Sequence, residues 1–169
     1  MQFIVEDGTG LSNSSSYSSV EAADDYATFW DNQFWLNLTE NEKQINLIKA
    51  TQYLDINLDY PSSILKQTQA LEYPRKIFTD KSGRDVEGIP SKLEEATIRL
   101  AIILAKDFNP SKQTKILTSQ SYGTSSETYL GSYIEGESED MLELNNILKQ
   151  LAKFGYAFKG IKQIDVVRG

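Results

Sequence analysis

The side chains able to do chemistry here are carboxylates, lysine, arginine, tyrosine, serine and threonine, because the sequence contains no histidine and no cysteine. Without histidine, the residue best suited to proton transfer near neutral pH is missing, and a Ser-His-Asp or Cys-His arrangement is impossible. Without cysteine, the chain has neither disulfides nor thiolate metal sites. The remaining groups show no spacing typical of catalysis. We therefore predict that this protein is not an enzyme.

Ligand-binding motifs are absent as well. The sequence has no Walker A motif, no GxGxxG, no zinc-ligand spacing and no EF-hand loop, and Gly8-Thr9-Gly10 is only a fragment of a glycine-rich loop. The carboxylate pairs Asp24-Asp25 and Glu94-Glu95 fall on predicted helices, where we interpret them as solvated faces. The sequence thus predicts no catalytic residue, no cofactor and no metal.

The charge of the chain bears on its partners. The formal net charge is −7 and the calculated pI is near 4.7. Proteins that bind nucleic acid through phosphates usually carry a basic patch. The most basic segment, residues 149–162, has four spaced lysines, which we interpret as a solvated helix edge. Trp30 and Trp35 neighbour Asp31 and Glu40 instead of cations, so we predict that both tryptophans lie in the core and do not stack on bases.

Four segments have the apolar spacing of helices and set the fold class. Ser18 with Glu21, and Thr39 with Glu42, form capping boxes at the start of the first two, and the second is expected over about 40–55. A third helix follows Pro90, with apolar residues around most of its circumference, and stops before Pro110. A fourth begins after Ser138. We predict a mainly α fold, a helical bundle of about four helices.

The remaining segments are expected to be extended or irregular. The predicted arm, residues 1–17, holds the apolar Phe3-Ile4-Val5 and a polar loop over residues 12–16. Residues 60–90 have three prolines and a turn at Asp80-Lys81-Ser82-Gly83, and residues 115–133 read as a small β-hairpin. No segment is long and apolar enough to cross a bilayer, and no signal peptide is visible, so a cytoplasmic origin is expected.

The C-terminal tail, residues 157–169, is the candidate site. It follows the expected helix stop at Gly155 and is too apolar for a solvated end. We predict a single domain over residues 1–169 in which this tail is an assembly element that binds another chain. Its candidate interface residues are Phe158, Ile161, Ile164, Val166 and Val167.

Three segments resemble a family of small phage and prophage proteins. The first runs from Ile4-Val5-Glu6-Asp7-Gly8-Thr9-Gly10-Leu11 to Tyr17-Ser18-Ser19-Val20-Glu21, and the second is Lys49-Ala50-Thr51-Gln52-Tyr53-Leu54-Asp55. The third is Gln69-Ala70-Leu71-Glu72-Tyr73-Pro74-Arg75, with Tyr73 where the family has tryptophan. Ile89-Pro90 before an apolar helix also matches. The resemblance covers residues 3 to 110.

This family is labelled DnaT-like and single-stranded-DNA-binding, and it also resembles phage head–tail adaptors. The adaptor resemblance implies a head–tail connector subunit in the virion neck, made in the host bacterial cytoplasm. It implies a homo-oligomeric ring, usually a dodecamer, that contacts the portal protein and a neck or tail protein and extends the channel for DNA, with no membrane partner. The label implies the alternative, a single-stranded-DNA-binding accessory protein.

The charge favours the connector, because DNA slides past an acidic surface without sticking. This sequence also has Asn57-Leu58-Asp59-Tyr60-Pro61 where many relatives carry an Arg-Gly-rich stretch. We therefore expect a structural subunit of a tailed-phage neck.

Overall fold

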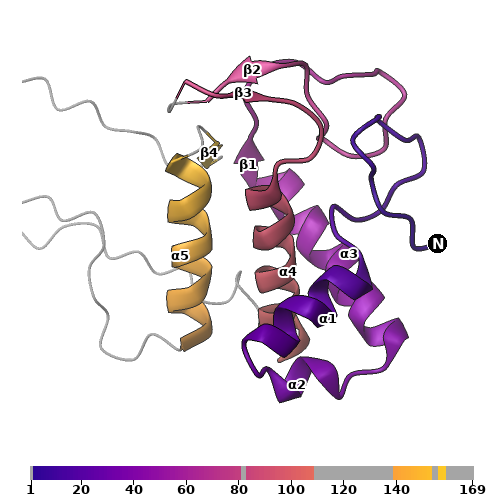
Figure 1. Cartoon of the computed structure of the whole chain (residues 1–169), viewed down its shortest axis with the longest axis vertical. Helices are drawn as coiled ribbons and strands as arrows, with labels where there is room; N and C mark the ends of the chain where they lie inside the picture. Colours follow the sequence, from indigo (N-terminus) through magenta and orange to yellow (C-terminus); the bar gives the residue numbers. More distant parts are fainter. Residues whose placement is uncertain (1, 81–82, 109–138, 154–155, 159–169) are drawn as a thin grey trace, which may run out of the picture.

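The computed structural model describes residues 2–80, 83–108, 139–153 and 156–158. These residues form five helices and four short strands (Figure 1). The helices are α1 (Val20–Phe29), α2 (Gln33–Leu36), α3 (Glu40–Asn57), α4 (Ser91–Ala105) and α5 (Glu139–Lys153). The strands are β1 (Leu58–Asp59), β2 (Phe78–Thr79), β3 (Asp85–Val86) and β4 (Ala157–Phe158). The predicted mainly α class is confirmed, with the one-turn helix α2 as the addition.

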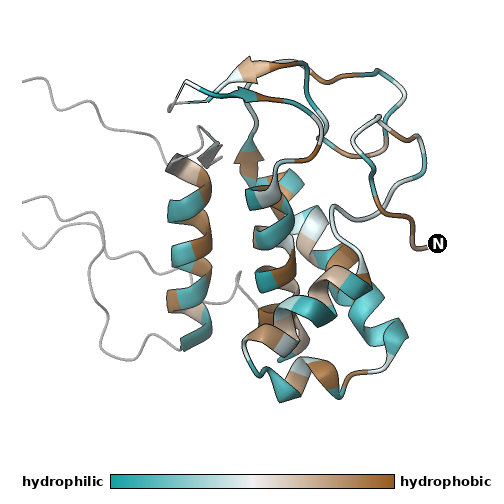
Figure 2. Cartoon of the chain, viewed as in Figure 1, coloured by the Kyte–Doolittle hydropathy of each residue, from teal (hydrophilic) through white to brown (hydrophobic). Residues whose placement is uncertain are grey.

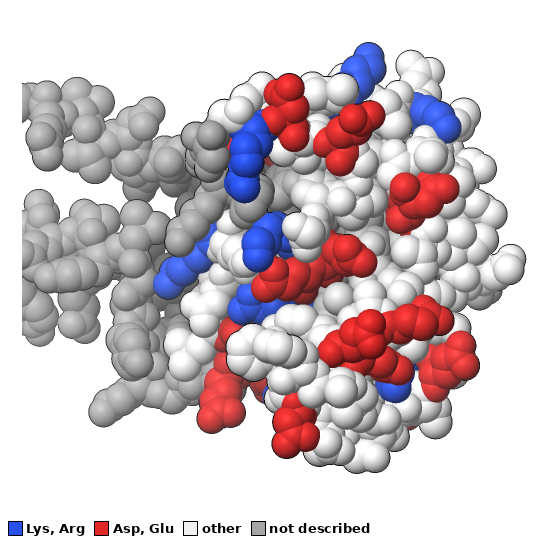
Figure 3. Space-filling view, viewed as in Figure 1, with Lys and Arg blue, Asp and Glu red and all other residues white. Residues whose placement is uncertain are grey.

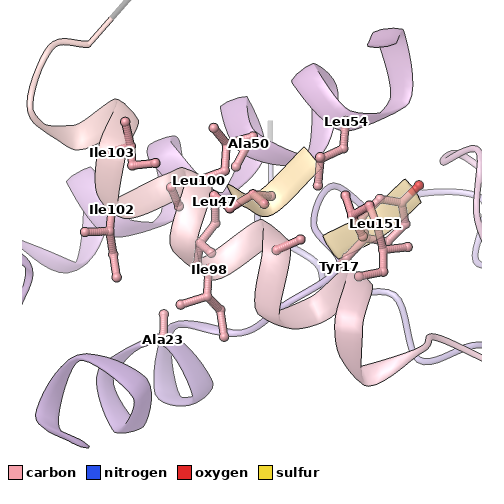
Figure 4. Packing of buried hydrophobic residues seen from close by; sticks show 14 of the residues in the cluster. Tyr17, Ala23, Leu47, Ala50, Leu54, Ile98, Leu100, Ile102, Ile103 and Leu151 are labelled. Atoms are coloured by element: carbon pink, nitrogen blue, oxygen red, sulfur yellow. The ribbon is translucent and has the colours of Figure 1, made fainter. Parts of the chain in front are cut away.

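The centre of the core lies between α3 and α4. Leu47, Ala50 and Leu54 of α3 face Leu100 and Ile103 of α4, all of them buried (Figure 4). Helix α4 buries residues around most of its circumference, as its broad apolar pattern predicts, because α5 and α1 also pack on it. Figure 2 shows the hydrophobic side of α5 turned toward α4, and the buried residues of α5 are Leu144, Ile147 and Leu151.

The starts of the first long helices test the two predicted capping boxes. The box at α3 is confirmed, since Thr39 Oγ1 accepts from the Glu42 amide and the Glu42 carboxylate accepts from the Thr39 amide. The predicted capping box at Ser18 is wrong, because the helix begins one residue later. Ser19 is the N-cap of α1, and its hydroxyl accepts from the Ala22 amide at 3.1 Å. Ser18 is instead fully buried in a turn closed by Ser16, whose hydroxyl donates to the Ser18 carbonyl.

The two tryptophans lie in opposite environments. Trp35 is fully buried, and its indole N–H donates to Asp24 at 2.8 Å. Trp30 is 64% exposed, so its predicted place in the core is wrong. The reason is the end of α1: Trp30 is the C-cap and Asp31 adopts a positive φ of 52°, which turns the chain toward α2 before Trp30 can reach the core.

The segments between the helices are irregular, as expected for residues 60–90. β2 and β3 pair antiparallel across the predicted turn, in which the Gly83 amide donates to the Asp80 carbonyl. β1 pairs antiparallel with β4. The predicted hairpin at 115–133, Ser138 and Gly155 lie outside the described residues. Among the described residues, no helix has both the length and the apolar character that crossing a membrane requires.

Candidate functional site

The predicted interface residues of the tail are only partly described. Phe158 lies in β4, and its backbone pairs with Leu58 of β1. Just before it, Tyr156 is buried and packs edge-on against Tyr60, with ring centroids 5.4 Å apart. Ile161, Ile164, Val166 and Val167 lie outside the described residues. The start of the tail is therefore attached to the fold, and its interface role stays a prediction.

The first resembling segment is a closed loop built around Glu6. This carboxylate is only 4% exposed and accepts from the backbone amides of Gly8, Gly10 and Leu11 and from the Ser14 hydroxyl. Gly8 and Gly10 have φ values of 90° and 77°, which favour glycine. The Glu-Asp-Gly-Thr-Gly run thus folds the arm back on itself. Residues 12–16 form a loop, as predicted, but Ser14, Ser15 and Ser16 are buried in it.

The other two resembling segments meet in a buried group that we call the tyrosine network: Tyr17, Asp55, Tyr60, Tyr73 and Tyr156. Tyr17 and Tyr60 donate their hydroxyls to the same oxygen of Asp55, at 2.5 and 3.0 Å. Tyr17 also accepts from the Tyr73 amide at 3.0 Å. The rings of Tyr60, Tyr73 and Tyr156 pack edge-on against one another. The network therefore ties the arm, α3, the 60–78 loop and the start of the tail together.

Burial dominates the electrostatics of the tyrosine network. Burial raises the pKa of the Asp55 carboxyl, although the Tyr17 hydroxyl and the Glu72 amide donate to it and oppose that shift. Burial likewise raises the pKa of Tyr17 well above its ordinary value, and the neighbouring Tyr60 and Asp55 raise it further. Tyr17 and Tyr73 are each 1% exposed, so no substrate reaches them. The network stabilises the fold and does not form an open active site.

The carboxylate pairs also have structural partners, which corrects their interpretation as purely solvated faces. Asp24 accepts from Trp35 and forms an ion pair with Lys43 at 2.9 Å. Glu95 pairs with Lys92 at 2.7 Å and lies 3.4 Å from Arg99. Across the described part of the chain, no group of acidic side chains is arranged to hold a metal ion.

Among the residues that the structure describes, the two most exposed aromatic side chains, Phe29 and Trp30, lie together at the C-terminal end of α1, beside the partly exposed Tyr26. We call Tyr26, Phe29 and Trp30 the aromatic cluster. Phe29 is 80% exposed and packs edge-on against Trp30, with centroids 5.3 Å apart, and Tyr26 lies 6.2 Å from Trp30. Large apolar side chains left in solvent next to one another are typical of binding surfaces.

The surroundings of the aromatic cluster are acidic. Glu21, Asp25 and Phe29 are four residues apart and so lie in one row along α1, and all three are exposed. Asp31, also exposed, follows Trp30 directly. Carboxylates gather over α1 and α3 in Figure 3. The nearby cations are engaged, since Lys43 pairs with Asp24 and Arg99 with Glu143. This surface combines aromatic rings with negative charge.

Comparison with known families assigns this chain to one of them. A family model described as "Putative DnaT-like ssDNA binding protein" matches residues 1–169. The chain belongs to this family. No curated protein and no solved structure matches it. Membership agrees with the resemblance on residues 3–110, and it extends the match through the tail.

Sequence reasoning missed the aromatic cluster because it assigned Trp30 to the core. The signal was present in the row of Glu21, Asp25 and Phe29: a stripe that begins with two carboxylates faces solvent, so the phenylalanine on it is exposed.

Proposed function

We propose that this protein is a non-enzymatic structural subunit that acts through protein–protein contacts in the neck of a tailed phage. The observation that carries the proposal is the aromatic cluster, with Phe29 and Trp30 exposed on an acidic helix face. Aromatic side chains in solvent contribute strongly to binding once a partner covers them. Adjacent exposed rings of this kind favour a protein that works in contact with a partner.

The partner at this surface is a protein. Base stacking on single strands normally occurs beside lysine or arginine, which neutralise the phosphates. Here Asp25 and Asp31 flank the rings instead, and the chain as a whole carries a charge of −7. Phosphates would be repelled, whereas a basic and apolar protein surface would be attracted.

The resemblance to head–tail adaptors supplies the finer assignment. In this proposal the subunits form a ring, a dodecamer in the usual adaptor arrangement, that joins the portal protein to a neck or tail protein. DNA passes through the ring without specific binding, and the acidic surface keeps it from adhering. The protein needs no cofactor or metal and resides in the virion after synthesis in the host bacterial cytoplasm.

A second candidate, single-stranded-DNA binding, is favoured by the description of the family to which the chain belongs. Its best surface would be the 60–78 loop. Lys66 and Lys76 are exposed there and form no ion pair with any described residue, and Leu65 and Ile77 beside them are partly or largely exposed. This loop offers two cations and aliphatic side chains, but of its three rings Tyr60 and Tyr73 are buried and Phe78 is partly buried.

One pair of measurements separates the two functions. Fluorescence anisotropy with labelled oligo-dT near physiological salt should give a dissociation constant weaker than about 10 µM for the full chain. Cosedimentation of the chain with portal-bearing heads should show binding, and Phe29→Ser/Trp30→Ser should reduce it. Sub-micromolar binding to oligo-dT that weakens steeply with salt and with Lys66→Glu/Lys76→Glu would overturn the neck proposal in favour of DNA binding.

A further inference from the structure

The aromatic cluster requires an occupant with two properties, apolar side chains and positive charge. The rings of Phe29 and Trp30 are exposed, and the exposed carboxylates on their face are Glu21, Asp25 and Asp31. Lys43 and Arg99, two cations near α1, are engaged in ion pairs with Asp24 and Glu143. The occupant should therefore bring its own cations.

A segment of this same sequence has that chemistry. Residues 159–169 contain the apolar side chains Ile161, Ile164, Val166 and Val167. They are interspersed with Lys159, Lys162 and Arg168, against a single carboxylate, Asp165. The tail is thus positively charged although the whole chain is strongly acidic. Its charge and its apolar character both complement the aromatic cluster.

We propose that residues 159–169 of one copy bind the aromatic cluster of a neighbouring copy. This inference rests on the proposed assembly function, and it assigns the two surfaces that join adjacent subunits. Because each copy has one tail and one cluster, and the two surfaces differ, the contact is head-to-tail and its repetition closes a ring if the rotation permits.

The position of β4 favours a neighbour's tail over the chain's own. In Figure 1, β4 lies at the opposite end of the molecule from α2 and the adjoining end of α1. Helix α1 packs on α4, and Arg99 of α4 pairs with Glu143, near the start of α5, at 2.7 Å. From Glu143 to the end of α5 at Lys153 the helix rises about 15 Å.

The distance restricts what the chain's own tail can do. To reach the aromatic cluster of the same chain, the segment after β4 must run back about 15 Å along α5. This distance takes about five residues in an extended conformation. Ile161 would then lie in the connecting stretch. The whole segment from Ile161 to Val167 could therefore not contact the rings of the same chain. The chain's own tail could bring only Ile164, Val166 and Val167 to the rings, and the crosslinking experiment below distinguishes it from a neighbour's tail.

The experiment uses the full chain and measures self-association by sedimentation velocity over a concentration series. Phe29→Ser/Trp30→Ser should weaken association at least about tenfold. Lys159→Glu/Lys162→Glu/Arg168→Glu should do the same by repulsion. Ile77→Ser is the matched control, because Ile77 is also an exposed large apolar side chain, 61% exposed, on a different surface. It should leave association unchanged.

A charge swap tests the pairing itself. The tail variant and Asp25→Lys/Asp31→Lys should each associate weakly alone, but their equimolar mixture should associate at least about tenfold more tightly than either. A photo-crosslinker at Val166, in a mixture of isotopically labelled and unlabelled chains, should join the tail to the α1 peptide of the other isotope.

Three results would overturn the inference: a chain that stays monomeric at all concentrations, a tail variant that associates as the wild type does, or crosslinks within one chain only. Each leaves the neck proposal open, because binding to portal-bearing heads is measured separately. If head binding fails while the crosslink between copies is found, the assembly contact stands and the neck assignment falls.

Discussion

The tyrosine network and the aromatic cluster use similar side chains for opposite purposes. In the network, Tyr17 and Tyr60 donate their hydroxyls to Asp55, and the Tyr73 amide donates to Tyr17. In the cluster, Phe29 and Trp30 pack on each other, Tyr26 lies beside Trp30, and Phe29 and Trp30 are largely exposed. The first arrangement stabilises the fold from within, and the second leaves free energy to be gained only when another surface covers it.

The comparison also distinguishes the residues that carry the family resemblance from the proposed binding surface. Glu6, Tyr17, Asp55 and Tyr73 all come from the resembling segments, and all make polar contacts within the fold, Asp55 partly buried and the other three buried. These four residues of the family pattern therefore have structural roles. The proposed binding surface, the aromatic cluster on α1, does not include these four residues.

The largest expected effect is the loss of the network's acceptor. Asp55→Ala should lower the free energy of unfolding by about 3–4 kcal/mol, because two buried tyrosine hydroxyls and the Glu72 amide lose their acceptor. Urea denaturation followed by circular dichroism measures this. Asp59→Ala, an exposed carboxylate four residues on, is the control and should cost less than about 0.5 kcal/mol. Equal costs would contradict the role of the network.

The pH dependence tests the charge of Asp55 separately. Burial raises the pKa of this carboxyl in the folded state above its ordinary value of 3.8. Between those two values the folded state holds a proton that the unfolded state has lost, so stability falls as pH rises through that window. Wild type should therefore lose stability relative to Asp55→Asn as pH rises from about 4. A relative gain would show that the Asp55 pKa is lowered instead.

The next effect concerns the arm. Glu6→Ala should cost about 2–3 kcal/mol, because the amides of Gly10 and Leu11 and the Ser14 hydroxyl lose a buried acceptor. The control is Asp7→Ala. Asp7 accepts only from Thr9 in an exposed turn, so its loss should cost less than about 1 kcal/mol. Thermal denaturation of both variants measures this difference. Equal losses would show that the Glu6 loop does not stabilise the fold.

What the sequence could predict was local. The capping box at Thr39 and the turn at Asp80–Gly83 depend on residues three apart, so composition and spacing suffice. The Glu6 loop and the tyrosine network could not be predicted. Tyr17 accepts from the amide of Tyr73, which is 56 residues away in the sequence. The burial of the serines depends on their contacts with Glu6 and the arm, which their composition does not reveal. Trp30 was misplaced because a single backbone angle at Asp31 decides where α1 ends.

A smaller effect is expected at the start of α1, which links the two regions because it begins beside Tyr17 and ends in the aromatic cluster. Ser19→Ala should cost about 1 kcal/mol, since the Ala22 amide loses its cap. Ser18→Ala should cost less than about 0.5 kcal/mol, because the Ser18 hydroxyl makes only a long contact, 3.5 Å, to the Ser19 carbonyl. If Ser18→Ala were the costlier change, the helix would begin at Ser18 as the spacing suggests.

The smallest effect on stability belongs to the aromatic cluster itself. Phe29→Ser/Trp30→Ser should change the free energy of unfolding by about 0.5 kcal/mol or less, because rings that stay 80% and 64% exposed bury little area on folding. Urea denaturation measures the change, and near-ultraviolet circular dichroism checks that the buried Trp35 keeps its environment. The expected loss of stability on removing these two rings is thus far smaller than the loss expected for Asp55→Ala. A loss above about 2 kcal/mol would place Phe29 and Trp30 in the core and remove the basis for a binding surface on α1.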